Sequence, residues 1–287
     1  IATHEDVEII DSLIINGSDC GNHTRFYSAY GGGSLNFQKP HQFNYIILDG
    51  LKNTGANVTL NHSVVKDSAT GWNFSNEPGP KTLYRVGGSG DWSDGNHWSD
   101  TSGGAPIGCV PTLLDDVHFD EHSFDTAAID IDINKYAYCR DLICDSLPYG
   151  ADVNLNQNSR MHIYGSLYLK PDFVFRAFNN IYINFMSDST GQQIDFSGSP
   201  LISKSSNVMA IKFEGNGSWE LLDSISMQAD TTYNYKSAIV LNNGTLNTNG
   251  QTIKTGYIRV ANGATIDVSG SALFLNESFG VVWEVNG

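Results

Sequence analysis

The stretch that decides the fold runs from Gly244 to Leu275 and reads GTLNTNGQTIKTGYIRVANGATIDVSGSALFL. Apolar and polar residues alternate along it in short segments that glycine begins or ends, at 244–250, 256–263, 263–270 and 270–275. Alternation with a period of two is typical of β-strands, and glycine marks the turns between them. This stretch therefore predicts a series of brief strands.

The same pattern extends over most of the chain. Alternating segments bounded by Gly, Asn, Asp or Pro recur at 129–133, 152–156, 161–165, 166–170, 181–185, 193–197 and 210–214. Strand-like segments also occur in the N-terminal region, at 7–17, 34–39, 43–50 and 56–75. No window of about twelve residues has apolar side chains at the helical positions i, i+3, i+4 and i+7. We therefore expect an all-β protein.

Brief glycine-bounded strands occur in sandwiches, barrels and β-solenoids alike. The Asn-Gly steps at Asn16, Asn243, Asn249 and Asn262 could form type I′ hairpin turns. The strands recur with irregular spacers, however, rather than as long matched pairs. This recurrence favours right-handed parallel β-helix (β-solenoid) modules, whose coils take roughly 20 residues.

The strand pattern breaks at SNEPGPKT (Ser75–Thr82), where proline and glycine cluster. We expect residues 1–77 to be the C-terminal part of a preceding β-rich or β-helical module, and 78–83 to be a linker. The second module would span 84–287. It would consist of a capping segment rich in Gly, Trp and Asp at 84–110, followed by β-helix coils at 111–287.

The composition narrows the classes of partner. Asp and Glu number 31 against 16 Lys and Arg, and the formal net charge is −15. The basic residues are scattered singly, so neither nucleic acid nor anionic lipid is an expected partner. No apolar run approaches the roughly 18 residues of a transmembrane segment. The acidic opening, IATHEDVEII, differs from a signal peptide, so we expect a mature product or an excised fragment.

Cysteine usage points to an exported protein. The chain has four cysteines, Cys20, Cys109, Cys139 and Cys144. They lack the paired C-x-x-C spacing of a structural zinc site and are too few for a small disulfide scaffold. One disulfide is the simplest interpretation.

A set of motifs carries a resemblance to a known family. In chain order they are GWNF (Gly71–Phe74), YRVGGSGDWSDGNHWS (Tyr84–Ser99), CVPTLLDDVHFDEHSF (Cys109–Phe124), AYCRDL (Ala137–Leu142), GNGSWELLD (Gly215–Asp223) and GTLNTNGQT (Gly244–Thr252). Their order resembles the repeated units of giant cell-surface gliding-motility adhesins of Bacteroidota (SprB-like adhesins), which the type IX secretion system exports. The similarity covers nearly the whole chain.

The resemblance implies a non-enzymatic cell-surface adhesin, in which this chain is a filament or stalk module for attachment to surfaces during gliding motility. It implies an extracellular location. The implied partners are extracellular surfaces or polysaccharides, further modules of the same chain, and the gliding and secretion machinery of the outer membrane. The alternative function is a secreted β-helix that binds or cleaves polysaccharide, as a hydrolase or a lyase. A passive spacer is a third candidate.

The resemblance also implies covalent modifications. Cys109 and Cys139 occupy matching places in it, which implies a disulfide between the cap and an early coil; two free buried thiols are the alternative. Asp followed by Ser or Thr and then a small apolar residue or Thr resembles the O-glycosylation signal of Bacteroidota, although such dipeptides are also common in turns. The candidate O-glycosylation sites are Ser12, Ser68, Thr126, Ser146, Ser189, Ser224 and Thr231.

Two features of the cap admit a binding role. Trp92 and Trp98 could form an exposed platform for sugar rings, but plugging the open end of a β-helix is the favoured interpretation. The candidate calcium ligands are Asp91, Asp94, Asp116 and Asp120, accompanied by Asn96 and Asp115. Calcium takes six to eight oxygen ligands, and aspartates in turns also cap backbone N–H groups, which we favour here. No other cofactor is expected.

Two acidic residues have the spacing of a catalytic pair. Asp130 and Asp132 stand one strand period apart, as the paired carboxylates of a hydrolase or lyase would, with only Lys135 or Arg140 nearby as a base. Alternation alone explains both aspartates as a solvent-facing pair, so no catalytic site is expected. The nearby histidines also share no metal, because His118 and His122 would lie roughly 13 Å apart on a strand. His97 stands apart from both in the sequence.

Overall fold

The computed structural model describes residues 2–285 apart from 4–6, 29–31, 67–68, 125–127, 135, 147–151, 157–158, 171–173, 178–180, 199–200, 204–207, 230–235 and 276–282. The chain forms two compact units. Unit 1 comprises Ile1–Pro80 and Gly108–Val110, and unit 2 comprises Lys81–Ile107 and Pro111–Gly287. The change at residue 80 falls within the expected linker 78–83. The end of the expected cap, Gly108–Val110, belongs to unit 1.

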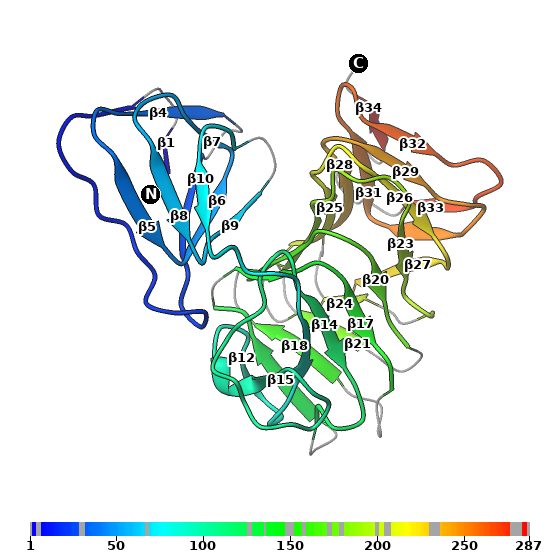
Figure 1. The fold of residues 1–287 in the computed structure, drawn as a ribbon. Helices are drawn as coiled ribbons and strands as arrows, with labels where there is room; N and C mark the ends of the chain where they lie inside the picture. The colour runs from blue at the N-terminus through cyan, green and yellow to red at the C-terminus, as the bar shows by residue number, and fades with distance from the viewer. Residues whose placement is uncertain are drawn as a thin grey trace. The chain divides into compact units, whose positions relative to one another are not determined.

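Strands account for nearly all of the regular structure (Figure 1). In the described ranges the one helical element is a 3₁₀ turn, η1 (Gly95–His97). The all-β prediction is confirmed. Over the same ranges, no helix has the length and the apolar character that crossing a membrane requires.

Unit 1 contains three parallel sheets, and each sheet takes every second or third strand of the chain. The first sheet has the order β1 (Ala2–Thr3), β3 (Thr24–Ser28), β6 (Ile46–Asp49) and β9 (Val64–Val65). The second is β2 (Val7–Ile9), β4 (Gly33–Phe37) and β7 (Leu51–Asn53). The third is β10 (Asn73–Ser75), β8 (Val58–Asn61) and β5 (His41–Asn44), which lie side by side in Figure 1.

The interior of unit 1 follows from the alternation along its strands. Inward positions hold apolar side chains that pack into one core, which includes Phe26, Leu48, Phe43, Leu60 and Trp72. The register pairs Phe26 with Leu48 and Phe43 with Leu60, so apolar residues from successive strands stack on one another. Such stacking removes apolar surface from water without any helix to cover the sheets.

A ladder of asparagine amides runs along one edge of unit 1. Asn44 Nδ2 donates to Asn16 Oδ1 at 3.2 Å, Asn61 Nδ2 donates to Asn44 Oδ1 at 2.8 Å, and Asn76 Nδ2 donates to Asn61 Oδ1 at 2.9 Å. The residues that follow Asn44 and Asn61 have positive φ, near +50°, where the chain turns out of one sheet toward the next. These hydrogen bonds thus fix the alignment of the corner that each asparagine occupies with the corner in the preceding part of the chain.

Unit 2 has a similar arrangement on a larger scale, with three sheets that take every third strand from β14 onward. The nine-stranded sheet has the order β13 (Trp98–Ser99), β11 (Thr82–Arg85), β14 (Asp116–Phe119), β17 (Leu142–Cys144), β20 (Leu167–Tyr168), β23 (Gln192–Asp195), β26 (Ser218–Leu221), β29 (Thr245–Asn247) and β32 (Thr265–Asp267). All of its pairs are parallel except β11 with β13.

The other two sheets of unit 2 contain parallel pairs throughout. The eight-stranded sheet has the order β12 (Gly90–Asp91), β15 (Ala128–Asp132), β18 (Asp152–Asn156), β21 (Val174–Ala177), β24 (Leu201–Ser203), β27 (Ile225–Ala229), β30 (Ile253–Thr255) and β33 (Leu273–Leu275). The seven-stranded sheet has the order β16 (Ala137–Cys139), β19 (Ser159–Ile163), β22 (Ile181–Phe185), β25 (Val208–Phe213), β28 (Lys236–Leu241), β31 (Tyr257–Val260) and β34 (Trp283–Val285).

Register in unit 2 builds continuous apolar ladders. In the nine-stranded sheet, the stacked partners are Leu83, Val117, Leu142, Leu167, Ile194 and Leu221, all of them buried. In the seven-stranded sheet, Phe185 stacks on Phe213 with ring centroids 5.2 Å apart. Trp219 of the nine-stranded sheet packs edge-on against Phe213. Each turn of the chain therefore buries its apolar side chains against the turns before and after it.

The Asn-Gly steps do not make hairpins. Asn249 and Gly250 both have positive φ, as a type I′ turn requires. They nevertheless join β29 to β30, which belong to different sheets. Strand neighbours in unit 2 come from the next turn of the chain rather than from across a tight turn, so the hairpin alternative is wrong.

Candidate functional site: the cap segment and the disulfide

The segment with the most unusual sequence, residues 84–107, is called here the cap segment. After β11 the chain turns through Gly87 and Gly88 and enters β12, which pairs with β15. The 3₁₀ turn η1 then leads into β13, which returns antiparallel to β11 with Arg85 opposite Trp98. The cap segment thus supplies an edge strand to each of two sheets: β13 to the nine-stranded sheet and β12 to the eight-stranded sheet.

Arg85 is the centre of the cap segment. Its side chain is fully buried, with its guanidinium over the ring of Trp98 at 5.3 Å. Its Nη2 donates to the carbonyl oxygens of Gly88 at 3.2 Å and Gly90 at 3.0 Å, and Nη1 donates to that of Asp91 at 3.3 Å. Burial lowers the pKa of Arg85 to about 10, although Asp94 and Asp91 favour the charged form. The cation organises the glycine-rich loop around itself.

The glycines of this loop are needed for close packing. A Cβ on Gly90, which has φ +149°, would come within 2.0 Å of His97 Nε2. His97 Nδ1 lies 3.1 Å from the carbonyl oxygen of Val86, which fixes the imidazole against the loop. A side chain at Gly90 would therefore displace His97.

Both cap tryptophans are buried. Trp92 and Trp98 are 2% and 0% exposed, their ring centroids are 4.8 Å apart, and Trp98 Nε1 donates to the carbonyl oxygen of Trp92 at 2.8 Å. Both rings also pack against Phe119, at 6.4 and 6.5 Å. A platform for sugar rings needs exposed ring faces, so that interpretation of the tryptophans is wrong.

The first two candidate calcium ligands cap turns. Asp91 Oδ1 accepts from the backbone N and the hydroxyl of Ser93, both at 2.7 Å, and Oδ2 accepts from Asn134 Nδ2 at 2.6 Å. Asp94 Oδ1 accepts from Asn96 N at 2.9 Å and is the N-cap of η1. These are the bonds that short polar side chains make to stabilise tight turns.

The other two candidate ligands are also engaged locally. Asp116 accepts two hydrogen bonds from the guanidinium of Arg140, one of them from Nε at 2.7 Å. Asp120 Oδ1 accepts from His122 N at 2.9 Å and from the hydroxyl of Ser123 at 3.2 Å. Among the described residues, no three His, Cys, Asp or Glu side chains are grouped as metal ligands. Calcium binding stays a prediction.

The histidines and the paired aspartates lie in separate surroundings. His118 Nδ1 lies 2.7 Å from Asp145 Oδ2, and His122 Nδ1 lies 3.0 Å from the Ser102 hydroxyl. Asp130 is exposed and Asp132 is partly exposed on β15, with the buried Ile131 between them. The two aspartates thus share the face opposite Ile131. Lys135, considered as a base, lies outside the described residues, and Arg140 pairs with Asp116.

Asp141 is a partly buried carboxylate whose pKa can be tested by substitution. Its Oδ1 accepts from Ser166 N at 2.6 Å. Burial raises the pKa of Asp141, and the nearby carboxylate of Asp116 adds to the rise. The folded state therefore holds the Asp141 proton more tightly than the unfolded chain does. The ionised carboxylate destabilises the fold at neutral pH, and the stability of the fold rises as the pH falls through the raised pKa.

We therefore expect Asp141→Asn to raise the melting temperature of unit 2 at pH 7 by about 1–2 °C, a small change because the carboxylate is partly solvated. The amide keeps an oxygen to accept from Ser166. The gain should shrink as the pH is lowered toward 4, where the parent carboxyl becomes protonated. Melting curves followed by circular dichroism between pH 4 and 8 measure this difference. A gain that grows toward low pH would contradict the assignment.

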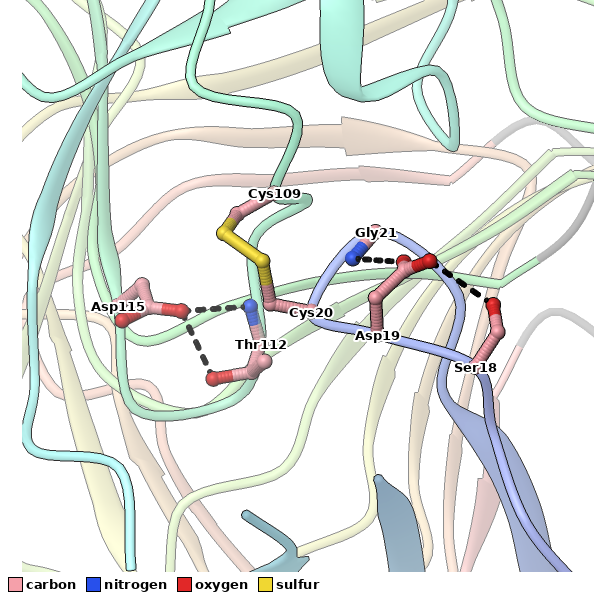
Figure 2. The surroundings of a disulfide bond; sticks show 7 residues. All are labelled: Ser18, Asp19, Cys20, Gly21, Cys109, Thr112 and Asp115. Carbon is pink, nitrogen blue, oxygen red and sulfur yellow. Dashed lines mark hydrogen bonds between the residues drawn. A yellow bond between two sulfur atoms is a disulfide. The ribbon is translucent and has the colours of Figure 1, made fainter. Parts of the chain in front are cut away.

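The disulfide joins Cys20 to Cys109, not Cys109 to Cys139 as the resemblance implied. Both bonded residues belong to unit 1, and Val110 N donates to the carbonyl oxygen of Cys20 at 3.1 Å beside the bridge. Cys20 lies within a tight turn in which Asp19 Oδ1 accepts from Gly21 N at 2.9 Å (Figure 2). A Cβ on Gly21 would come within 2.3 Å of the carbonyl oxygen of Gly108, so glycine permits the close approach of the two segments.

Cys139 cannot take part in that bridge because of where its strand places it. It lies on β16 with its side chain fully buried, in register with Ile163 of the next strand. Burial raises its pKa well above the ordinary value, and burial raises the pKa of Cys144 to about 12. Both thiols are free, buried and protonated, and behave as small apolar side chains.

The candidate O-glycosylation sites differ in accessibility. Ser12, Ser146 and Ser189 are exposed, whereas Ser224 is partly buried and its hydroxyl accepts from Thr252 N at 3.1 Å. Ser68, Thr126 and Thr231 lie outside the described residues. Glycosylation stays a prediction at all of them.

Two residues that matter here were missed in the sequence. Arg85 is a single arginine in a strand and carries no motif of its own. Its one sequence signal is that the loop of glycines and an aspartate following it presents backbone carbonyls. Cys20 stands 89 residues from its partner, a separation that no local pattern reports.

The chain was compared with protein-family models, curated proteins and solved structures, and none of them matched.

Proposed function

We propose that each unit is a right-handed parallel β-helix. The support lies in the strand order, since each sheet takes every third strand in unit 2 and every second or third strand in unit 1, and almost all pairs are parallel. Side chains of like character stack in register from turn to turn, as the apolar ladder of unit 2 and the asparagine ladder of unit 1 illustrate. A chain that winds through three faces in a fixed order accounts for all of these pairings.

We propose further that the chain is a non-enzymatic module of a cell-surface adhesin, a filament or stalk segment that mediates attachment during gliding motility. The observation that carries the proposal is the run of in-register parallel strands in unit 2, whose first turns are covered by the cap segment. Such an array extends along one direction and resists bending, because every strand is bonded to the turns on both sides. The motif order that resembles gliding adhesins gives this rod its proposed place on the cell.

The disulfide supports the proposed extracellular location, because disulfides persist mainly in oxidising compartments. Under the proposal, the type IX secretion system exports the protein and further modules of the same chain flank this one. The gliding machinery of the outer membrane then carries it along the surface.

Competition for attachment tests the adhesive function. Beads coated with the full chain should compete with gliding cells for a polysaccharide-coated surface, and beads coated with an unrelated acidic protein should not. Beads that fail to compete at saturating density would favour a passive spacer and overturn the proposal. The alternative, a polysaccharide hydrolase or lyase, is tested on the same polysaccharides. Release of reducing or unsaturated ends by the parent, abolished in Asp130→Ala, would also overturn the proposed non-enzymatic function.

A further inference from the structure

The outward face of the seven-stranded sheet of unit 2 differs from the rest of the surface. Alternation turns Ile183, Ile211 and Ile258 inward, and the residues between them outward. Register arranges the outward residues in two columns that cross the strands. One column is Arg160, Tyr182, Ala210, Ala238 and Tyr257, and the other is Tyr138, His162, Asn184, Lys212, Val240, Arg259 and Glu284.

This face has an apolar centre of its own. Ala210, Ala238 and Val240 form a buried cluster outside the main core, and the half-buried rings of Tyr182 and Tyr257 pack against it. The small alanine side chains leave the two tyrosines as the main projections of their column. The face therefore carries a half-buried tyrosine ring at each end of a short buried apolar strip.

Cations gather on the same face of an otherwise acidic protein. Arg160 lies over the rings of Tyr136 and Tyr182 at 5.9 and 5.8 Å, and Lys212 Nζ lies 4.4 Å from the ring centre of Tyr182. Burial lowers the pKa of Lys212, Arg160 and Arg259 lower it further, and Glu214 opposes them. The Glu214 carboxylate accepts from Asn242 Nδ2 at 2.9 and 3.0 Å. Three like charges thus lie on one face, with the Glu214 carboxylate beside Lys212 and with Glu284 opposite Arg259 in the register.

Asn184 gives an independent sign of a ligand. Its side chain is 6% exposed and stands between His162 and Lys212 in the outward column. Within the part of the chain that the structure describes, its Oδ1 has no hydrogen-bond partner. A buried polar atom without a partner costs roughly 1–3 kcal/mol, and a hydroxyl group from a ligand would satisfy it.

The spacing of the cations identifies the kind of polymer that fits. Arg160, Lys212 and Arg259 lie on β19, β25 and β31, which are every second strand of the sheet. Neighbouring strands are about 4.8 Å apart, so the cations recur roughly every 10 Å across the strands. That distance is near the length of two sugar residues. A nucleic acid strand carries one charge per roughly 3.4 Å, which is much denser than this array.

We propose that the tyrosine–cation face, defined by Tyr136, Arg160, Tyr182, Lys212, Tyr257 and Arg259, binds a linear anionic polysaccharide laid across the strands. Sugar rings stack on the tyrosines, and carboxylate or sulfate groups pair with the three cations. This inference rests on the proposed adhesive function, since it names the surface and the substrate class of that attachment.

Binding of the full chain to defined polysaccharides tests the inference. The probes are polygalacturonate for carboxylate, chondroitin sulfate for sulfate, neutral dextran, and single-stranded DNA, each measured by biolayer interferometry at about 0.15 M salt. Binding to either anionic polysaccharide is the expected result, and the two arms distinguish which anionic group is preferred. Binding to neither, equal binding to dextran, or tighter binding to DNA would each overturn the inference.

Substitutions locate the binding on this face. The double variant Lys212→Gln/Arg259→Gln should weaken binding by roughly tenfold or more, since it removes two of the three ion pairs. Lys254→Gln is the matched control, because it removes an exposed cation from the eight-stranded sheet, and it should change binding less than about twofold. Melting curves show whether each variant is folded. Equal binding by a folded double variant and the parent would contradict the inference.

The bead assay separates this inference from the proposed function. If the chain binds the polysaccharide through this face but coated beads do not compete with cells, the adhesive function fails and the binding face stands. If beads carrying the double variant compete as well as the parent does, adhesion stands and the assignment of this face is overturned.

Discussion

Arg85→Ala is expected to destabilise unit 2 by about 3–5 kcal/mol, the largest effect of a single substitution that we predict. The change removes a buried cation that satisfies the carbonyl oxygens of Gly88, Gly90 and Asp91. Those carbonyls would then be buried without donors, and a cavity would open beneath Trp98. The loop also positions β12 for pairing with β15, so we expect disorder of the loop to weaken this pairing.

Denaturation in urea, followed by tryptophan fluorescence, measures this effect, because the Arg85 guanidinium lies over Trp98 and Trp92 packs against Trp98. Arg85→Met refills the apolar volume without restoring the donors, so it should recover only part of the loss. The matched control is Lys254→Ala, an exposed cation of the same unit, for which a change of about 0.5 kcal/mol or less is expected. A loss of under about 1 kcal/mol for Arg85→Ala would show that the loop does not depend on this cation.

Cleavage of the Cys20–Cys109 disulfide should destabilise unit 1 by about 4 kcal/mol. The bridge closes a loop of 89 residues, and the chain-entropy model assigns a stabilisation of this size to so long a loop. Cys20→Ser should lower the melting temperature of unit 1, and a reductant should do the same to the parent. The Cys20→Ser/Cys109→Ser variant is the control, because reductant should leave its melting temperature unchanged.

Peptide mapping checks the pairing itself. Digestion without reduction should give one linked peptide that contains Cys20 and Cys109, while Cys139 and Cys144 react with alkylating agents only after unfolding. A linked peptide that contains Cys109 and Cys139 would restore the pairing that the motif resemblance implied.

Local patterns predicted the strands well and their partners poorly. The segment 256–263 was expected to be a strand and contains β31, and 263–270 contains β32, because alternation is a property of consecutive residues. The strand that pairs with β31 is β28, which lies more than fifteen residues earlier in the chain. No residue within β31 carries that information, so the hairpin turns at Asn249-Gly250 could not be rejected from the sequence.

The candidate site shows the same limit. The turn-capping roles of Asp91 and Asp94 follow from a donor two residues away, which the sequence displays. The disulfide partner of Cys20 and the grouping of Arg160 with Lys212 depend on which turns of the chain lie together. Cations that are scattered singly in the sequence come to lie on one face because they occupy outward positions on β19, β25 and β31 of the same sheet. The composition therefore gives the net charge correctly but does not show that several positive side chains lie on one face.

The disulfide has a mechanical consequence. When the two ends of the chain are pulled apart, the Cys20–Cys109 bond carries the tension directly from one cysteine to the other. The residues between them, including the junction near residue 80, then bear no load. An extended chain spans about 3.4 Å per residue, so the bond withholds roughly 300 Å of slack that unravelling would otherwise release. The bond thus limits how far a pulling force can lengthen this part of the chain.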